Sequence, residues 1–375
     1  MISEGKADVD IPDGVFFNPE MRFCRDLSVL VVRALLARKA VRAVDATAGS
    51  GVRAIRYAKE GEDAVGELFL VDVNHSAAEA AKKNLAVNKV KGEVIESSFA
   101  RFANSEYARG GFGLVEIDPF GSPVPFIHDA CRVSRDGTLL SVTATDTAVL
   151  CGAHPKACLK NYQAKPLNPF TCHEVGARIL IGKIARTASE FNCGLKPVLI
   201  LSHKHYFKVF AIVEEGAEKA VASIKELGFF AHCNRCFNRA VEKGIANSLP
   251  RICERCGGRY EYAGPLWLGK LHEKATLERV MALNEGKNPE IDKVVSLMVE
   301  ECDMPPFYFE LHRITERLRT NAVSPRAVMS ELKEEGFKAS QTHFQPNSIK
   351  TDAGISEVEA VIKKARSYKL ITDSK

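Results

Sequence analysis

A glycine turn flanked by two aspartates is the first segment whose residue types and spacing indicate chemistry. In VRAVDATAGSGVRAIRYAK (41–59) an apolar run ends at Asp45, and a helical pattern follows the turn at Gly49 and Gly51. Glycine is needed where the backbone takes a positive φ or approaches a ligand closely. A second apolar run ends at Asp72, where a carboxylate is placed to bind ribose hydroxyls. The pattern therefore predicts a nucleotide-type ligand above the turn.

The charge of Asp45 separates two such ligands. A nicotinamide dinucleotide is the obvious alternative, because Gly-x-Gly with a later acid is typical of its sites. However, a carboxylate in the last position of the strand would repel a pyrophosphate, and Ala54 replaces the third glycine of that pattern. An aspartate there suits a ligand with a cationic amino group, such as S-adenosylmethionine. A tight turn without any ligand is the remaining alternative. The expected cofactor-binding residues are Asp45, Gly49, Gly51 and Asp72.

A third acid, Asp118, directly follows the apolar run of FGLVEIDPFGSP (112–123). The run indicates a buried parallel strand that Pro119 ends, and such strand ends face the ligand crevice of open α/β sheets. Asp-Pro-Phe resembles the Asp/Asn-Pro-Pro-aromatic motif of amino-methyltransferases. The exocyclic amine of a base is a poor nucleophile, and a carboxylate and carbonyls that accept its N–H groups localise its lone pair. We expect Asp118, Pro119 and the stacking ring of Phe120 at a catalytic centre; a structural turn is the alternative.

Four cysteines in the second half have the spacing of a metal site. Cys233 and Cys236 form one Cys-x2-Cys pair, and Cys253 and Cys256 form another, with sixteen residues between the pairs. This spacing predicts a four-cysteine zinc site, closed and structural because four thiolates leave no position for water. Residues 231–259 also hold six Lys/Arg against two Glu, which favours contact of the segment with RNA phosphates. For any single arginine, a solvated surface is the favoured alternative.

The elements that must position these groups form two parts. Strands at 41–45, 68–73 and 112–117 alternate with helical patterns, which predicts a Rossmann-like methyltransferase domain over residues 1–216, including an N-terminal extension. Residues 217–375 predict a smaller α+β domain that carries the zinc site. Within it, two helical patterns and two short strands give 305–375 the outline of a winged helix. From the sequence, Thr342, His343 and Phe344 face either the substrate or the core, and the pattern does not decide between them. The basic residues of this part are candidates for contact with an RNA backbone: Arg313, Arg317, Arg319, Arg326, Lys338 and Lys350.

The bulk properties are those of a folded protein of the cytoplasm. The chain has 375 residues, 46% hydrophobic and 26% charged, with a net charge of +5. No apolar run is long enough to cross a bilayer, and the polar N-terminal segment does not resemble a signal peptide. Eleven cysteines in this compartment predict thiols or metal ligands rather than disulfides. Those without ligand spacing are expected to be small buried side chains: Cys131, Cys151, Cys158, Cys172 and Cys193. The nearby lone histidines, such as His173, are expected to be satisfied polar groups.

Six segments together resemble the tRNA (guanine-26-N2)-dimethyltransferases of archaea and eukaryotes, nearly from end to end. They are FFNPEMRFCRD (16–26), DATAGSGVRAIRYAKE (45–60), DVNHSAAEAAKKNLAVN (72–88), IDPFGSP (117–123), TATDTAVLCG (143–152) and SQTHFQPNSIKTDA (340–353). The resemblance implies that S-adenosylmethionine donates two methyl groups in turn to N2 of guanine 26 in a tRNA substrate.

The resemblance also implies residue roles. Asp118 is the catalytic group, Phe16 lines the guanine pocket, Arg25 and Arg53 contact the cofactor, and Asp72 binds its ribose. By pattern alone, Phe16 belongs in the core. Ser98 and Phe99 occupy the adenine-binding position, where the family usually has Asp-Ala, and Cys24 replaces its usual Asn.

Two other functions remain open from the sequence. One is an amino-methyltransferase that acts on another base or another RNA. The other is a non-enzymatic, zinc-dependent RNA-binding protein with a vestigial cofactor fold. No obligate protein partner is evident, and no membrane association is expected.

Overall fold

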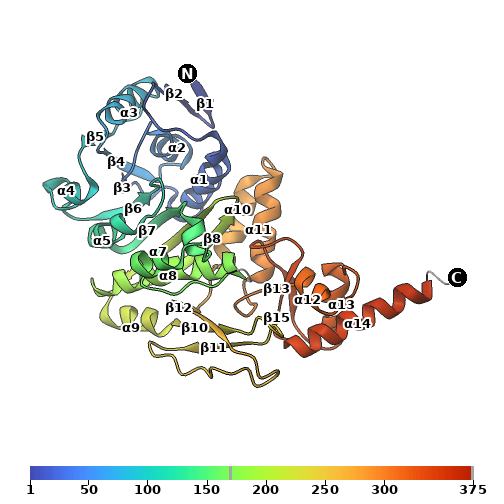
Figure 1. The fold of residues 1–375 in the computed structure, drawn as a ribbon. Coiled ribbons are helices and arrows are strands. Elements are labelled where there is room, and N and C mark those ends of the chain that lie inside the picture. The colour runs from blue at the N-terminus through green and yellow to red at the C-terminus, as the bar shows by residue number, and fades with distance from the viewer. Residues whose placement is uncertain (169–170, 373–375) are drawn as a thin grey trace.

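The computed structural model describes residues 1–168 and 171–372, and within them a seven-stranded sheet forms the centre of the molecule (Figure 1). Its strand order is β5-β4-β3-β6-β7-β9-β8. The first five strands are parallel, and β9 is antiparallel to both of its neighbours. The predicted α/β class is confirmed. The strands are β3 Val41–Asp45, β4 Val65–Asp72, β5 Glu93–Glu96, β6 Phe112–Ile117, β7 Ser134–Ala144, β8 Cys193–His203 and β9 Tyr206–Glu215.

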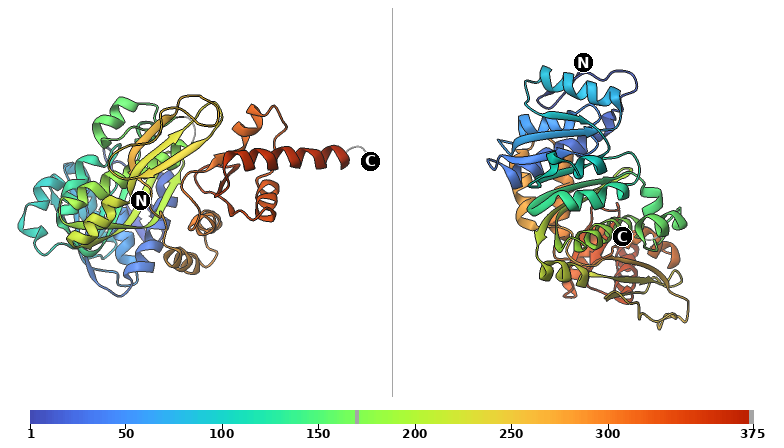
Figure 2. Two further views of the ribbon diagram at one scale, coloured as in Figure 1. Left: turned by 90° about the horizontal axis from the view of Figure 1, so that it is seen from below. Right: turned by 90° about the vertical axis from the view of Figure 1, so that its left-hand side faces the viewer.

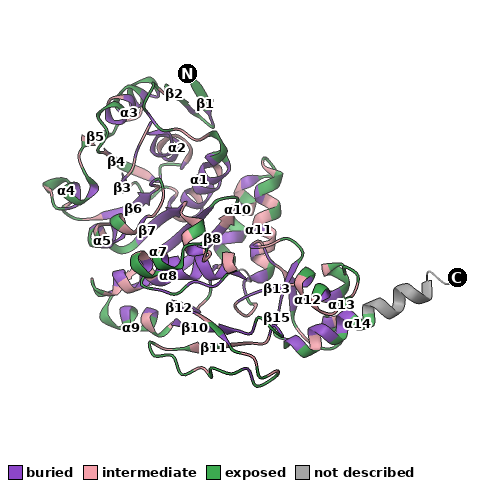
Figure 3. Cartoon of the chain, viewed as in Figure 1, coloured by how far each residue is buried: buried purple, intermediate pink, exposed green. Residues whose placement is uncertain are grey.

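The order of the strands reverses at β3, which pairs with β4 on one side and β6 on the other. In open α/β sheets, ligands bind outside the carboxyl ends of the strands at such a point. Every residue of β6 is buried, as expected for a strand covered on both faces (Figure 3). Asp45, Asp72 and Asp118 therefore lie side by side at the carboxyl ends of three adjacent strands.

Helices cover both faces of the sheet. On one face, α1 (Arg22–Leu36), α2 (Val52–Glu60) and α3 (His75–Val87) share a hydrophobic core with the strands. On the other face, α4 (Phe99–Ala103), α5 (Val124–Val133) and α8 (Cys172–Ser189) form a second core. The short helices α6 (Thr147–Leu150) and α7 (Pro155–Tyr162) lie between β7 and α8 in the chain. Among the described helices, none has the length and apolar character that crossing a membrane requires.

A later part of the chain returns to the first face, which the sequence did not lead us to expect. Helices α10 (Lys274–Asn284) and α11 (Pro289–Glu301) place Leu277, Val280 and Ile291 in the same core as Leu27 and Val31 of α1. At the N-terminus, the hairpin of β1 (Ile2–Glu4) and β2 (Ala7–Val9) also joins this core. The first face is thus covered by segments from three regions of the sequence.

A second sheet follows α9 (Ala217–Lys225) and has the order β11-β10-β12. Its strands are β10 Leu227–His232, β11 Arg239–Lys243 and β12 Glu261–Trp267. Strand β12 packs closely on α8, because a Cβ atom at Gly182 would lie 3.3 Å from Leu266 Cα. The two Cys-x2-Cys pairs lie next to this sheet, which packs against the central sheet through α8.

The C-terminal part groups at one end of the molecule, far from β5 (Figure 2). Its sheet order is β13-β15-β14, with β13 Phe309–Glu310, β14 Ala339–Gln341 and β15 Ser348–Thr351. Helices α12 (Leu311–Arg317), α13 (Pro325–Glu334) and α14 (Ile355–Thr372) complete it. The structure decides between the two alternatives for Thr342, His343 and Phe344: all three side chains are buried, so they do not face a substrate. Lys350 is also buried and pairs with Glu174 at 2.9 Å, so it does not face RNA.

Strand β8 is the edge of the central sheet, and two histidines cover it. The Ile200 N–H donates to His272 Nδ1 and the Ser202 N–H to His343 Nε2, both at 3.3 Å. The other nitrogen of each ring faces Glu301 at the end of α11. Each imidazole accepts a hydrogen bond on one side, and burial lowers the pKa of His272 to about 4, which favours the neutral form of that ring. The edge is closed by these side chains and by the Glu273 main-chain N–H, which donates to the Val198 carbonyl at 3.0 Å, rather than by another strand.

Candidate active site and metal centre

The glycine turn lies between β3 and α2 in the chain and contacts the end of β4. Gly49 and Gly51 have φ of +52° and +77°, in the region that favours glycine. A Cβ atom at Gly51 would also lie 2.9 Å from Leu70 Cδ2, so a side chain would push the turn away from the sheet. The Gly49 N–H donates to Asp72 Oδ2 at 2.9 Å, and Asn74 N–H donates to Oδ1 at the same distance. The Asp72 carboxylate is therefore fixed beside the turn, at the end of β4.

Asp45 lies at the end of β3 and is almost fully buried. Its Oδ1 accepts the Thr47 N–H at 3.2 Å. Burial raises the pKa of Asp45 to about 7, the negative charge of Glu116 adds to the rise, and Arg53 opposes it. Ionising this carboxyl is costly in the free protein, and a cationic ligand group beside it would lower that cost. The residue thus fits the ammonium or sulfonium of S-adenosylmethionine.

Asp118 follows β6, and the Arg53 guanidinium of α2 pairs with its carboxylate. Its backbone N–H donates to Thr47 Oγ1 at 2.9 Å, which ties the Asp-Pro-Phe segment to the glycine turn. Burial alone would raise the pKa of Asp118, but the charges of Arg53 and Lys208 outweigh burial and hold the pKa below its usual value. The side chain remains 21% exposed, so an ionised carboxylate is accessible at the carboxyl ends of the strands.

A buried cluster of charged and polar side chains lies next to the Arg53–Asp118 pair. Glu116 Oε1 lies 3.6 Å from Arg53 Nε and accepts a hydrogen bond from Lys208 Nζ of β9. Tyr57 donates its hydroxyl to Glu116 Oε2 at 2.7 Å, and Lys208 also donates to Thr143 Oγ1 at 3.0 Å. Sequence analysis missed Glu116 and Lys208. A charged residue inside each of two apolar strand patterns, GLVEI and KVFAI, was the signal that could have identified them.

Arg25 of α1 is buried and holds the N-terminal segment. Its Nε donates to Glu4 Oε1 at 2.6 Å, and its NH2 group lies 2.5 Å from Glu4 Oε2. It also donates to the Asn18 carbonyl at 3.2 Å and lies 4.9 Å from the Phe17 ring centroid. The contacts with the Phe17 ring and the Asn18 carbonyl hold the two residues that directly follow Phe16.

Two exposed aromatic rings meet beside Asp118. The Phe16 and Phe120 centroids are 6.0 Å apart, and the rings pack edge to face. Phe16 is 67% exposed and Phe120 is 88% exposed. The pattern-based expectation that Phe16 lies in the core is wrong, because the segment 10–18 is extended or turned and crosses the glycine turn: the Phe16 carbonyl lies 3.5 Å from a Cβ placed on Gly49. Uncovered rings of this kind can stack on a base.

The loop after Asp118 is anchored to the end of β7. Pro119 is buried. The Gly121 N–H donates to Thr145 Oγ1 at 2.7 Å, and the Thr145 N–H donates to the Gly121 carbonyl at 3.0 Å. Ser122 Oγ lies 2.9 Å from the Tyr162 hydroxyl, which donates to Asp146 at 2.8 Å. Asp146 therefore has a structural partner, and α7 supports the loop through Tyr162.

Ser98 and Phe99 lie after β5, beside the end of β4. The Ser97 N–H donates to the Asp72 carbonyl at 2.9 Å, which places this segment next to the ribose-type acid. Ser98 is exposed and accepts the Arg101 N–H at 3.2 Å, as the N-cap of α4. Phe99 is buried in the core of the second face. Of the two, Ser98 is accessible to a ligand.

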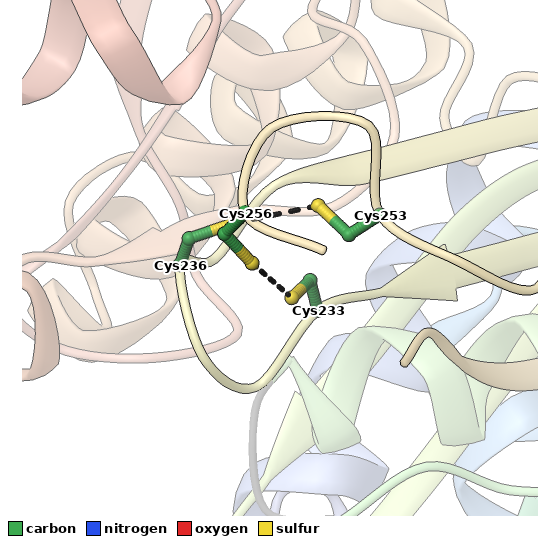
Figure 4. A group of neighbouring side chains, drawn as sticks. All are labelled: Cys233, Cys236, Cys253 and Cys256. Carbon is green, nitrogen blue, oxygen red and sulfur yellow. Dashed lines mark hydrogen bonds between the residues drawn. The ribbon is translucent and has the colours of Figure 1, made fainter. Parts of the chain in front are cut away.

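The four cysteines converge as their spacing predicted (Figure 4). All four sulfurs lie within 4.8 Å of one another, with Cys233–Cys256 and Cys236–Cys253 each at 3.5 Å. Zn–S bonds of 2.3 Å in a tetrahedron require sulfurs about 3.8 Å apart. The two pairs sit in two turns of the same kind. In each turn the carbonyl of the first cysteine accepts the N–H of the residue four positions later, which is Phe237 in one and Gly257 in the other, and both of these residues have a positive φ. The cluster fits a tetrahedral metal ion.

Several basic residues near the cysteines have partners inside the protein. Arg239 donates to the Phe307 carbonyl at 2.6 Å, and Arg255 pairs with Glu359 of α14 at 2.8 Å. Lys243 lies 2.7 Å from Glu226. Arg239 and Arg255 link the second sheet to the C-terminal part, and Lys243 links β11 to the end of α9, so the simple count of positive charges overstated the charge available to RNA.

Comparison with known proteins places these features in one family. The family model described as "N2,N2-dimethylguanosine tRNA methyltransferase" matches residues 1–363. A tRNA (guanine(26)-N(2))-dimethyltransferase of Methanothermobacter thermautotrophicus is 36% identical over 375 residues, covering 96% of this chain and 98% of the relative. The enzyme of the same description from Pyrococcus furiosus is 35% identical, covering 97% and 98%.

A solved structure agrees along nearly the whole chain. The complex of Trm1 from Pyrococcus horikoshii with S-adenosyl-L-methionine superposes with a TM-score of 0.85 at 31% identity. The match covers 96% of this chain and 98% of that structure. With the family model and the relatives, this agreement shows that the chain belongs to the N2,N2-dimethylguanosine tRNA methyltransferase family.

Proposed function

We propose that this protein transfers two methyl groups from S-adenosylmethionine to N2 of guanine 26 in tRNA. The observation that carries the proposal is an ionised carboxylate, Asp118, beside two exposed rings at the switch point of the sheet. Membership in the family supports the substrate and the two methylations. The reading as a non-enzymatic RNA-binding protein explains neither the carboxylate nor the rings.

In the proposed reaction, S-adenosylmethionine supplies an electrophilic methyl group. Asp45, Gly49, Gly51, Asp72 and Ser98 hold the donor at the ends of β3, β4 and β5. Arg53 orients Asp118, and Asp118 accepts an N–H of the guanine amine, which directs the nitrogen lone pair toward the methyl group. Once the N–C bond forms, the nitrogen is cationic and strongly acidic, so even a carboxylate of low pKa receives its proton.

The second methylation repeats this step at the same nitrogen. A guanine amine has two N–H bonds, and each transfer uses one of them, so Asp118 has a proton to accept in both rounds. Its partial exposure lets the proton leave to solvent between rounds. Phe16 and Phe120 hold the base after it leaves its stack, which costs a few kcal/mol. Pro119 stiffens the backbone between the carboxylate and the ring.

Arg25 is proposed as a positioning residue. It fixes the segment that carries Phe16 through Glu4 and the Asn18 carbonyl. The four cysteines are proposed to bind Zn²⁺ in a closed structural site, which supports the adjacent RNA-contacting surface. Free thiols and a thiolate metal site both suit the reducing cytoplasm.

The test is methyl transfer to an unmodified tRNA transcript, followed by nucleoside mass spectrometry. We expect N2,N2-dimethylguanosine that disappears when guanine 26 is changed to adenine. Asp118→Ala is expected to abolish turnover and to leave donor binding nearly intact in calorimetry. A different methylated nucleoside would refute the substrate assignment, and full activity of Asp118→Ala would refute the role of that carboxylate.

A further inference from the structure

Two cysteines that the sequence left without a role lie together with a histidine. The ligand atoms of Cys151, Cys172 and His173 are all within 4.8 Å of one another, and the three residues are partly exposed. The expectation that Cys151 and Cys172 are isolated, buried side chains is therefore wrong. Residues 151 and 172 are distant in sequence, and the packing of α6 on α8 brings them together.

That packing is close. Gly176 lies one turn into α8, and a Cβ atom there would be 3.2 Å from the Leu150 backbone, directly before Cys151. Cys172 is the first residue of α8, an 18-residue helix. The positive end of a helix stabilises an anion and opposes a cation. The His173 ring is held by Phe344, whose carbonyl lies 3.2 Å from Nδ1.

The two thiols differ in reactivity. The hydrogen bond from the Cys151 thiol, together with the His173 ring and main-chain N–H, lowers the pKa of Cys172 to about 5 against the effect of burial. The same hydrogen bond, together with burial, raises the pKa of Cys151. Cys131 gives a contrast within the chain, because burial raises its pKa to about 12. Cys172 is thus a thiolate with a protonated thiol as its neighbour.

We propose that Cys172 and Cys151 form a redox-active dithiol that closes to a disulfide by exchange with low-molecular-weight disulfides. The Cys172 thiolate attacks one sulfur of the small disulfide, forming a mixed disulfide and releasing one thiolate, which takes up a proton. Cys151 then loses its proton and attacks Cys172 Sγ, releasing the second thiol. The protein is oxidised by two electrons, and the small disulfide is reduced to two thiols.

The disulfide would link the end of α6 to the start of α8. Helix α6 begins directly after Asp146, and Asp146 contacts the Tyr162 hydroxyl, which also contacts Ser122 of the loop after Asp118. A covalent link between the two helices would therefore fix the support of this loop in one arrangement. Oxidation is therefore expected to change methyl transfer to tRNA while leaving donor binding nearly unchanged, because the donor site lies at β3 and β4.

The experiment treats the full metal-loaded chain with hydroxyethyl disulfide at pH 7, alkylates the remaining thiols and maps the peptides. We expect a Cys151–Cys172 cross-link that a dithiol reductant reverses. Cys151→Ser should trap a mixed disulfide on Cys172, formed about tenfold or more faster than any adduct on Cys131, because only the thiolate reacts. Cys172→Ser should leave Cys151 unmodified, and Cys131→Ser is the matched control that keeps the cross-link.

Two results would overturn the inference. The first is recovery of Cys151 and Cys172 as alkylated thiols in the folded wild type. The second is a metal ion held by this cluster: the metal content of the wild type would then exceed that of Cys172→Ser by one ion per chain. An unchanged metal content with a reversible cross-link supports the dithiol.

Discussion

The pH dependence of donor binding follows from Asp45. Its carboxyl is buried at the end of β3, and its pKa is raised to about 7. If the ionised form receives the cationic donor, binding requires loss of this proton. Affinity should then rise as the pH rises through 7, and Asp45→Asn should remove the rise.

The magnitude follows from the pKa. About one tenth of the free protein carries an ionised Asp45 at pH 6, and about nine tenths at pH 8. Affinity is therefore expected to fall about tenfold from pH 8 to pH 6, or about 1.4 kcal/mol. Asp45→Asn should bind about tenfold or more weakly than the wild type at pH 8, because it offers no charge to the donor, and should show a flat profile over this range.

Titration calorimetry of S-adenosylmethionine at several pH values measures these affinities. Repeating it in buffers of different ionisation enthalpy counts the protons released, and close to one proton is expected at pH 6. Methylthioadenosine is the matched control ligand, since it lacks the sulfonium and the amino acid portion, and its affinity should not follow Asp45. A wild-type profile that is flat between pH 6 and 8, or one that Asp45→Asn retains, would refute the role of Asp45.

Four further outcomes are expected. Asp45→Asn should raise the free energy of unfolding at pH 8, because the buried ionised carboxylate destabilises the folded wild type. This gain should shrink as the pH falls from 7 toward 4, where the folded wild type is protonated; thermal melts at pH 8 and pH 4 check this. Lys208→Met should lower the free energy of unfolding by about 3–5 kcal/mol in urea titrations, because Glu116 loses its buried partner. Phe120→Ala should lower single-turnover methylation about ten- to hundredfold at unchanged donor affinity, and an equal loss in donor affinity would contradict base stacking. Chelation should release one metal ion and weaken tRNA binding more than donor binding; normal tRNA binding by the metal-free chain would contradict the structural role.

Strand ends and cysteine spacing were predictable because each depends on short stretches of sequence. The apolar run before Asp118 and the glycine after Asp45 required only local patterns, and the two Cys-x2-Cys pairs each form a tight turn. The resemblance to the family added residue roles that no pattern supplied. By pattern alone, Phe16 was assigned to the core, because burial of a ring depends on whether other segments cover it.

Contacts between distant segments could not be predicted. Glu116 and Lys208 lie on β6 and β9, and only the sheet order brings them into contact with each other. The same holds for Lys350, a candidate RNA contact by sequence, which pairs with the buried Glu174. A charged residue in the sequence says nothing about which partner the fold will supply, so surface charge was overestimated wherever ion pairs are long-range.

The imidazoles along β8 have a consequence for self-association. An open sheet edge is a template onto which another molecule can add a strand, and proteins that leave such an edge bare tend to polymerise. Here His272 and His343 accept hydrogen bonds from the N–H groups of Ile200 and Ser202. A side chain, unlike a strand, offers no row of main-chain groups with which a further strand could pair. Both rings are supplied by residues far downstream of β8. During synthesis the Ser202 N–H therefore remains without its acceptor until more than a hundred further residues have emerged, since His343 comes so late in the chain. Over that interval this part of the edge lacks the cover that it has in the finished chain.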